Sequence, residues 1–133
     1  MSDQLPALWT VPVAALAAFV VGGLWYSPPV FGRIWQRLAG LSDEDMRGRN
    51  LGAVFGGSFA CALVAAAVLA PFVGAESGPG FGALAGALAG LGWVATGLIT
   101  TALFERRPIA LALVNGGYQT VSLTAMGLVI GLG

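Results

Sequence analysis

Four apolar stretches, each about as long as a lipid bilayer is thick, occupy most of this 133-residue chain. A helix rises about 1.5 Å per residue, so roughly 20 apolar residues cross the hydrocarbon core. Backbone groups in lipid must form their hydrogen bonds within the segment, which predicts helices. The expected spans are residues 7–26, 51–73, 81–104 and 109–132. We predict an all-α integral membrane bundle of four transmembrane helices, forming a single domain over residues 1–133.

The composition agrees with a membrane protein and excludes several classes of function. Hydrophobic residues make up 57% of the chain and charged residues 9%, against about 25% charged residues in soluble domains. The net charge is zero and histidine is absent, which disfavours nucleic-acid binding and a haem or zinc site. The single cysteine, Cys61, lies in the second span, where we expect a small buried hydrophobe. We therefore expect no metal, no cofactor and no nucleic-acid partner.

All six arginines lie in the first and third loops between the expected spans. They are Arg33, Arg37, Arg47 and Arg49 in residues 27–50, and Arg106 and Arg107 in residues 105–108. The loop between the second and third spans contains Glu76 and no basic residue. Loops of membrane proteins that lie in the cytoplasm carry an excess of basic residues. We therefore expect a multi-pass protein with both arginine-bearing loops in the cytoplasm and both termini outside.

A short amphipathic helix is expected directly after the first span. Trp25 and Tyr26 favour the headgroup level of the membrane, and the prolines that follow cannot continue a helix. The second helix has Val30, Phe31, Ile34, Trp35 and Leu38 on its apolar face, and Arg33, Gln36 and Arg37 on its polar face. Such a helix lies in the membrane interface in contact with lipid. Packing under the bundle is an alternative, and the two arrangements are compatible.

The remainder of this loop contains a helix-start motif. Ser42, followed three residues later by Asp45, has the form of a capping box. This motif predicts a short water-facing turn of helix that leads into the second span. We interpret the loop as a solvated structural segment, with a site for docking a partner as the alternative.

Small residues recur at every fourth position in the second and third spans. They are Gly52, Gly56 and Ala60 in the second span, and Gly82, Gly86 and Gly90 in the third, with Ala83 and Ala87 beside them. This spacing leaves a groove in which another helix can approach closely. Because glycine costs helix stability, a triple run needs such a reason. We expect helix packing, within this chain or with a neighbouring copy; a constriction lined by backbone is the alternative.

The third and fourth spans are separated by residues 105–108 alone, which predicts antiparallel neighbouring helices. Glu105 lies at the expected membrane edge, where an unpaired carboxylate is costly. We expect it to pair with an arginine of the same loop, or with Arg33 or Arg37. We interpret such a pair as a structural clamp.

The fourth span is the most polar of the four. Asn115, Gln119 and Ser122 share one face with Tyr118 beside them, Thr120 and Thr124 form a weaker face, and Thr96 and Thr100 of the third span are placed to meet the stripe. A polar stripe in lipid must face protein or water. Hydrogen bonding between helices, worth about 0.6 kcal/mol per contact, is one interpretation. A polar track for a small solute or anion is the other.

No charged residue lies in the middle of an expected span. Proton-coupled carriers and pumps normally need such a group, and without histidine neither a Ser-His nor a Cys-His pair can form. The acidic residues are not arranged with a nucleophile. We therefore expect no enzymatic activity and identify no catalytic residue.

Several short segments resemble one known family. They are residues 23–28 (Gly-Leu-Trp-Tyr-Ser-Pro), Phe31 with Gly32, Trp35, residues 40–46, Thr100, residues 102–108 and residues 115–118. In these segments the chain resembles the DUF1761 family of small bacterial membrane proteins of unknown function. The resemblance covers nearly the whole chain. It implies a four-span protein of the bacterial cytoplasmic (inner) membrane and no known chemistry.

Two functions from different classes follow from these patterns. The first is an oligomeric channel or permeation pathway for a small ion or neutral solute, lined by the polar stripe of the fourth span. The second is a non-transporting scaffold, or a module that binds lipid or another membrane protein through Phe31, Ile34 and Trp35. In the second, Arg33 and Arg37 would lie against anionic headgroups. Membrane lipids and further copies of this chain, in a homo-oligomer, are the expected partners.

Overall fold

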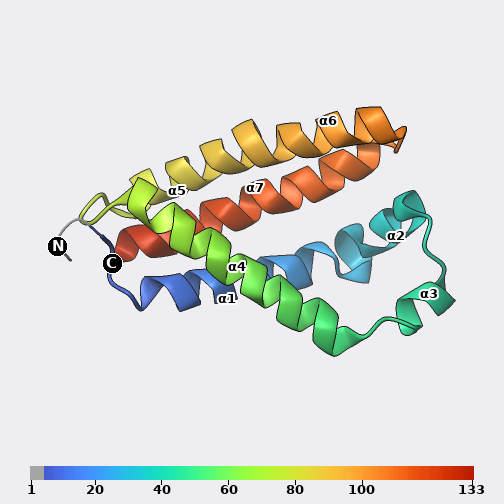
Figure 1. Ribbon diagram of the computed structural model, residues 1–133, viewed down its shortest axis with the longest axis horizontal. Coiled ribbons are helices and arrows are strands. Elements are labelled where there is room, and N and C mark those ends of the chain that lie inside the picture. Colours follow the sequence, from blue (N-terminus) through green and yellow to red (C-terminus); the bar gives the residue numbers. More distant parts are fainter. Residues whose placement is uncertain (1–4) are drawn as a thin grey trace.

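The computed structural model describes residues 5–133, and every regular element in that range is a helix (Figure 1). In chain order the elements are α1 (Thr10–Trp25), η2 (Pro28–Gly32), α2 (Arg33–Ala39), α3 (Asp43–Arg47), α4 (Leu51–Val73), α5 (Pro79–Ala89), η3 (Gly90–Ala95), α6 (Thr96–Glu105) and α7 (Ile109–Leu132). η2 and η3 are π-helical turns. The predicted all-α fold is confirmed for these residues. The predicted domain also included residues 1–4, which lie outside the described range.

Two helices are long and apolar enough to cross a membrane: α4, and the continuous helix Pro79–Glu105 formed by α5, η3 and α6. α1 has 16 residues, fewer than the roughly 20 that a span needs. Together with Pro28–Ala39 it would provide a third span, but the two parts are bent by 54°. α7 has 24 residues, and its polar side chains lower its hydropathy. By length and composition, the described helices therefore offer two spans, or three with the bent pair.

α7 is the central helix of the bundle. It packs along α5, η3 and α6 on one side and against α1 on another, while α4 contacts α1 and α7. The continuous helix Pro79–Glu105 and α7 run side by side after a short turn (Figure 1), which confirms that they are antiparallel neighbours. α2, α3 and the α6–α7 turn lie at one end of the bundle, which we call the arginine end (Figure 1). The C-terminus and the α4–α5 turn lie at the other end.

The hydrophobic core lies in the half of the bundle that is away from the arginine end. Its buried members are Ala14, Ala18, Ala66, Leu69, Ala70, Val73, Leu123, Met126 and Ile130. α4 contributes buried residues only from Ala66 onward, whereas residues 51–58 are exposed. The first half of α4 therefore diverges from α7. Cys61 is exposed rather than buried as expected, because it lies on the outward side of α4, before the helix joins the core.

Three glycines spaced by four positions, Gly82, Gly86 and Gly90, lie directly against α7. A Cβ atom added to either of the first two would collide with a backbone carbonyl oxygen of α7, that of Gly127 or Leu123. Glycine at these positions lets the two backbones approach each other more closely than any side chain would allow. The small-residue run of the third expected span thus has its partner helix within the same chain.

Candidate functional site

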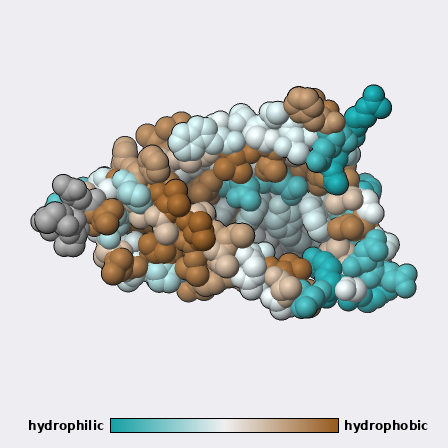
Figure 2. Space-filling model, in the orientation of Figure 1, coloured by the Kyte–Doolittle hydropathy of each residue, from teal (hydrophilic) through white to brown (hydrophobic). Residues whose placement is uncertain are grey.

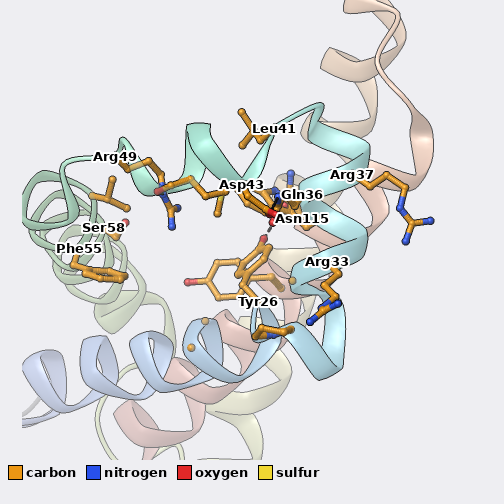
Figure 3. Close-up of a pocket in the computed structure, with 18 of the residues that line it drawn as sticks. Tyr26, Arg33, Gln36, Arg37, Leu41, Asp43, Arg49, Phe55, Ser58 and Asn115 are labelled. Carbon is orange, nitrogen blue, oxygen red and sulfur yellow. Dashed lines mark hydrogen bonds between the residues drawn. The ribbon is translucent and has the colours of Figure 1, made fainter.

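A cleft of about 1270 Å³ opens at the arginine end, where α4 diverges from the rest of the bundle. Residues of α1, the η2–α2 segment, the α3 region, the first half of α4, and α7 line it (Figure 3). Figure 2 shows hydrophilic side chains inside the hollow and hydrophobic side chains on the neighbouring outer surface. Its volume exceeds the roughly 300–1,000 Å³ of ordinary small-molecule pockets. The cleft is therefore large enough for a bulky ligand.

Positive charge predominates on the wall of this cleft. Arg33, Arg37 and Arg49 line it together with one carboxylate, Asp43. The Asp43 carboxylate accepts a 2.8 Å hydrogen bond from the Gln36 amide nitrogen. In Figure 3, the guanidinium group of Arg49 reaches in from the segment between α3 and α4, whereas that of Arg37 points away from the centre of the cleft. The arginine end of the cleft thus suits an anionic group.

Within residues 5–133 one ion pair is present, and it lies outside the cleft. Arg107 Nε is 3.2 Å from Glu105 Oε1, and both side chains are more than half exposed. Among the partners expected for Glu105, the pair uses an arginine of the same loop rather than Arg33 or Arg37. An exposed pair contributes little to stability. In the described part of the chain, the arginines of the cleft are thus not held by carboxylates.

The capping box predicted in the loop is confirmed. Ser42 Oγ accepts a 3.0 Å hydrogen bond from the Asp45 backbone N–H, and Asp45 Oδ2 accepts a 2.9 Å bond from the Ser42 backbone N–H. The box starts α3, whose neighbouring residues form one side of the cleft mouth. Its backbone hydrogen bond from Ser42 is the main reason why the pKa of Asp45 is lowered.

The deeper part of the cleft is neutral and polar on one side. Tyr26 donates its phenol hydrogen to Asn115 Oδ1, with 2.7 Å between the two oxygens. The ring centroids of Tyr26 and Tyr118 are 5.3 Å apart. Gly22 makes room for this arrangement, because a Cβ at that position would lie 3.3 Å from Tyr118 Cε1. The end of α1 and the first part of α7 are joined here.

The opposite side of the deeper cleft is apolar. Val54 and Phe55 of α4 and Phe19 of α1 line it, and the Phe19 and Phe55 rings meet edge to face at 5.9 Å. The cleft therefore combines a cationic end, a neutral hydrogen-bonding wall and an aromatic wall. This combination matches a molecule with an anionic head and an apolar body.

An aromatic corner fixes the chain as it leaves α1. Trp25 Nε1 donates a 3.0 Å hydrogen bond to the carbonyl oxygen of Val114, and a Cβ on Gly117 would lie 2.8 Å from the indole ring. The ring centroids of Phe31 and Trp25 are 4.7 Å apart, and those of Trp35 and Tyr26 are 5.7 Å apart. These contacts hold η2 and α2 against α7.

The expected apolar face of the second helix is divided between two environments. Phe31 and Trp35 are partly buried in the aromatic corner. Val30 and Ile34 are exposed, at 46% and 42%. The first pair therefore packs on the bundle, and the second pair remains free to contact lipid. The residues that pack on the bundle and the residues that are exposed are thus different members of the same face.

The polar stripe predicted on the fourth span is only partly assembled into the cleft. Asn115 and Tyr118 line the cleft. Gln119 is partly buried and is not among the lining residues, and Ser122 is buried, with 1% of its surface exposed. The stripe therefore runs from the cleft into the packed interior of the bundle.

Thr96 and Thr100 are not brought to this stripe, contrary to the prediction. The π-turn η3 contains one extra residue, so the face that begins at Gly90 continues at Ala95, five positions on, and then at Ala102. This shift turns the two threonines outward, where they are exposed. Their hydroxyl groups donate to backbone carbonyl oxygens one turn earlier in the same helix, at 2.8 and 2.9 Å.

Gly52 and Gly56, which were expected to pack against a helix, lie on the exposed first half of α4. A Cβ on Gly56 would meet no described atom within 4 Å, and one on Gly52 would meet only the side chain of Asn50, the N-cap of the same helix. Within the described residues these glycines have no helix partner. Both glycines are therefore open to contact from outside the described residues.

Many residues that line the cleft were not predicted as site residues, among them Phe19, Gly22, Gln36, Asp43, Arg49, Val54 and Phe55. Gly22, in an apolar helix, is a usable signal, because the bulky side chain of Tyr118 approaches it, whereas a Cβ on Gly23 would meet nothing within 4 Å. The remaining residues come together through the angle at which α4 leaves the bundle. No local pattern encodes that angle.

Comparison with known proteins adds one finding to this geometry. A family model with the description "Protein of unknown function (DUF1761)" matches residues 9–131. No curated protein and no solved structure matches the chain. The matched range includes all the residues that line the cleft. It confirms the resemblance inferred from the Trp-Tyr-Ser-Pro segment, and the chain therefore belongs to the DUF1761 family of proteins of unknown function.

Proposed function

We propose that this protein is an integral membrane protein whose cleft binds an anionic amphiphile at the cytoplasmic face of a bacterial inner membrane. The observation that carries the proposal is the composition of the cleft. Arg33, Arg49 and Arg37 line it, the last with its guanidinium turned away from the centre (Figure 3), together with an aromatic wall and neutral hydrogen-bonding groups. Arginines near a membrane surface attract anionic headgroups, each by about 1 kcal/mol. The apolar wall would receive the hydrocarbon part of the same molecule.

The proposed topology has four crossings, made by α1 with the bent segment after it, α4, the continuous helix Pro79–Glu105, and α7. The arginine-bearing segments share one end of the bundle (Figure 1), which supports placing that end in the cytoplasm. Both termini then lie outside. α7 is the least apolar of the four, and its packing against α1, α5 and α6 supports a position inside the bundle, where its polar groups are shielded from lipid.

Competition between two lipids tests the proposal directly. The protein in mild detergent is mixed with equal amounts of phosphatidylglycerol and phosphatidylcholine of the same chain length, and bound lipid is counted by native mass spectrometry. We expect the anionic lipid to be retained preferentially. We also expect the double variant Arg33→Ala/Arg49→Ala to lose about tenfold or more in that preference, because two headgroup contacts are removed.

A matched control separates the cleft from charge in general. Arg47→Ala/Arg107→Ala makes the same change in net charge at arginines that do not line the cleft, and it should leave the preference unchanged. Equal loss in the two double variants would mean that the whole arginine end attracts lipid without a specific site. Equal retention of both lipids by the wild type would reject the proposal.

Permeation through a homo-oligomer is a second candidate function. Asn115 favours it, because this residue lines both the cleft and a smaller cavity of about 200 Å³ between α6 and α7. The exposed glycine face around Gly56 would supply the contact between copies. Apolar replacement of Asn115 or Gln119 should then abolish the flux of a small ion or neutral solute into liposomes while assembly stays intact. Unchanged flux in both variants would remove this candidate.

The proposal contains no catalytic step. The one carboxylate among the lining residues, that of Asp43, accepts a hydrogen bond from Gln36, and binding in the cleft requires neither a nucleophile nor a metal. Membrane lipid is the main partner in this proposal. Another membrane protein, or a second copy on the exposed half of α4, would be an additional partner compatible with it.

A further inference from the structure

Asn115 lies almost two helical turns into α7, counted from the end of that helix at the arginine end of the bundle (Figure 1). It is the seventh residue of α7, which begins at Ile109, so its Cα lies about 9 Å along the helix axis from that start. The headgroup layer of a bilayer is roughly 5–7 Å thick on each side of the hydrocarbon core. If the arginine end lies at headgroup level, Asn115 lies near the boundary between headgroups and acyl chains.

The side chain of Asn115 has a fixed acceptor and a free donor. Its Oδ1 accepts the 2.7 Å hydrogen bond from Tyr26, and its Nδ2 donates to no residue in the range 5–133. No buried side-chain nitrogen or oxygen in that range lacks a partner, so Nδ2 is accessible rather than enclosed. Because Oδ1 already accepts from Tyr26, the N–H groups of the amide are the unused donors that Asn115 offers to the two spaces it lines, the cleft and the smaller cavity between α6 and α7.

We infer that Asn115 is a ligand-binding residue whose Nδ2 donates to an ester carbonyl of a diacyl phospholipid, while the phosphate of that lipid lies against Arg33 and Arg49. The inference rests on the proposed function and deepens it from any anionic amphiphile to an anionic glycerol ester. In such a lipid the two ester carbonyls lie just below the phosphate, at the upper end of the acyl chains. A fatty acid or an alkyl sulfate has the anionic head but no carbonyl at that second level.

The chemistry of the two levels favours this class of ligand. A charged donor at the deeper level would be costly so close to hydrocarbon, whereas a neutral amide is tolerated. Ester carbonyls are acceptors that lack hydrogens, so they match an N–H group and would not compete with Tyr26 for Oδ1. The aromatic wall of Phe19 and Phe55 lies where the acyl chains would begin. The cleft would thus bind the phosphate, the ester carbonyl and the acyl chain of one lipid, in that order.

Ester and ether forms of one lipid test the inference on the whole protein. Diacyl phosphatidylglycerol and its dialkyl ether analogue have the same headgroup and chain length, but the ether form lacks the carbonyl oxygens. In native mass spectrometry of the wild-type protein with equal amounts of both, we expect the ester form to be favoured about two- to tenfold, the range expected of one hydrogen bond. Equal binding of the two forms would overturn the inference.

Two substitutions on α7 test whether Asn115 is the source of the preference for the ester lipid. Asn115→Leu should bring the ester-to-ether ratio to about one, whereas Gln119→Leu, which removes the same amide one turn further along α7 from a residue that does not line the cleft, should keep it. An ester preference that survives in Asn115→Leu would assign it to another group and overturn the inference. Should Asn115→Leu fail to fold, Asn115→Met keeps a weak acceptor for Tyr26 in its thioether but has no donor, so it too should abolish the preference.

A failure of the inference about Asn115 can be distinguished from a failure of the proposed anion-binding function. Loss of anionic lipid in Arg33→Ala/Arg49→Ala without any ester preference in the wild type would support the cleft as an anion site and reject the role of Asn115. An absence of any arginine-dependent retention would reject the proposed function itself.

Discussion

The phenol of Tyr26 and the amide of Asn115, 89 positions apart in the sequence, are joined by a 2.7 Å hydrogen bond between the end of α1 and α7. The Tyr26 ring also packs against the rings of Trp35 and Tyr118, with centroid distances of 5.7 and 5.3 Å. One residue therefore connects α1, α2 and α7 where the chain bends by 54°. The same bond orients the Asn115 amide in the wall of the cleft, so one contact both joins two helices and positions a residue of the proposed site.

Removing the Tyr26 hydroxyl tests the strength of this contact. Tyr26→Phe should lower the free energy of unfolding by about 1 kcal/mol, because a part-buried hydrogen bond is lost and the Asn115 oxygen loses its partner. Thermal unfolding in detergent micelles measures the change. In a double-mutant cycle with Asn115→Ala, the coupling energy should be about 0.6–1.5 kcal/mol. Tyr118→Phe is the control, since its hydroxyl forms no hydrogen bond within residues 5–133. An equal loss there would contradict this account.

Gly86 tests the close packing of α5 on α7. In Gly86→Ala, the new Cβ would collide with the carbonyl oxygen of Leu123, and a backbone atom cannot move aside as a flexible side chain would. We expect a loss of about 1–3 kcal/mol in the free energy of unfolding, as for overpacked cores. In Gly56→Ala the Cβ meets open space, and stability should rise by up to about 1 kcal/mol from helix propensity. Similar effects of both substitutions would argue against the α5–α7 contact.

Much of the helical framework could be predicted from hydrophobic length and helix-ending residues. The expected spans 51–73 and 109–132 have the same bounds as α4 and α7, because Asn50, Gly74 and Pro108 mark their ends. The capping box of α3 was also readable, since its two members are three residues apart. Each of these features depends on residues that are close together in the sequence, so one sequence is enough to predict them.

The arrangement of the cleft could not be predicted in the same way. The π-turn η3 shifts the face of the helix by one residue, and no residue in Gly90–Ala95 requires that turn. The divergence of α4 exposes Cys61 and brings Arg49 to the cleft, yet it results from packing between helices distant in the sequence. The angle between helices is decided by the sum of those contacts, and it leaves no pattern within α4 itself.

Acid should loosen α3 at the mouth of the cleft. The pKa of Asp45 is lowered from its ordinary value of 3.8, mainly by the backbone N–H of Ser42 and further by the Ser42 side chain. A carboxyl whose pKa is lower in the folded state contributes stability above its ordinary pKa and loses it as the pH falls through the folded-state pKa. The helical Cα chemical shifts of Asp43–Arg47 should therefore be constant near neutral pH and decline below pH 3.8.

Two variants assign this acid response. Asp45→Asn has no charge to lose, so its α3 shifts should not change across the same acid range. Glu44→Gln alters a neighbouring acid outside the capping box, and the decline should persist. A decline of equal size in Asp45→Asn would show that another group controls the end of this loop.

Thiol labelling tests the orientation of the bundle in the membrane. In a Cys61→Ser background, a single cysteine is placed at Ser77, in the α4–α5 turn, or at Arg47, at the end of α3; both positions are exposed. Because the arginine end is proposed to face the cytoplasm, a membrane-impermeant maleimide added to spheroplasts should label Ser77→Cys and spare Arg47→Cys. Inverted vesicles should give the reverse pattern. Labelling of both positions from the same side would mean that these two ends do not lie across the bilayer from each other. Labelling of Arg47→Cys in spheroplasts would assign the proposed cleft to the outer face of the membrane.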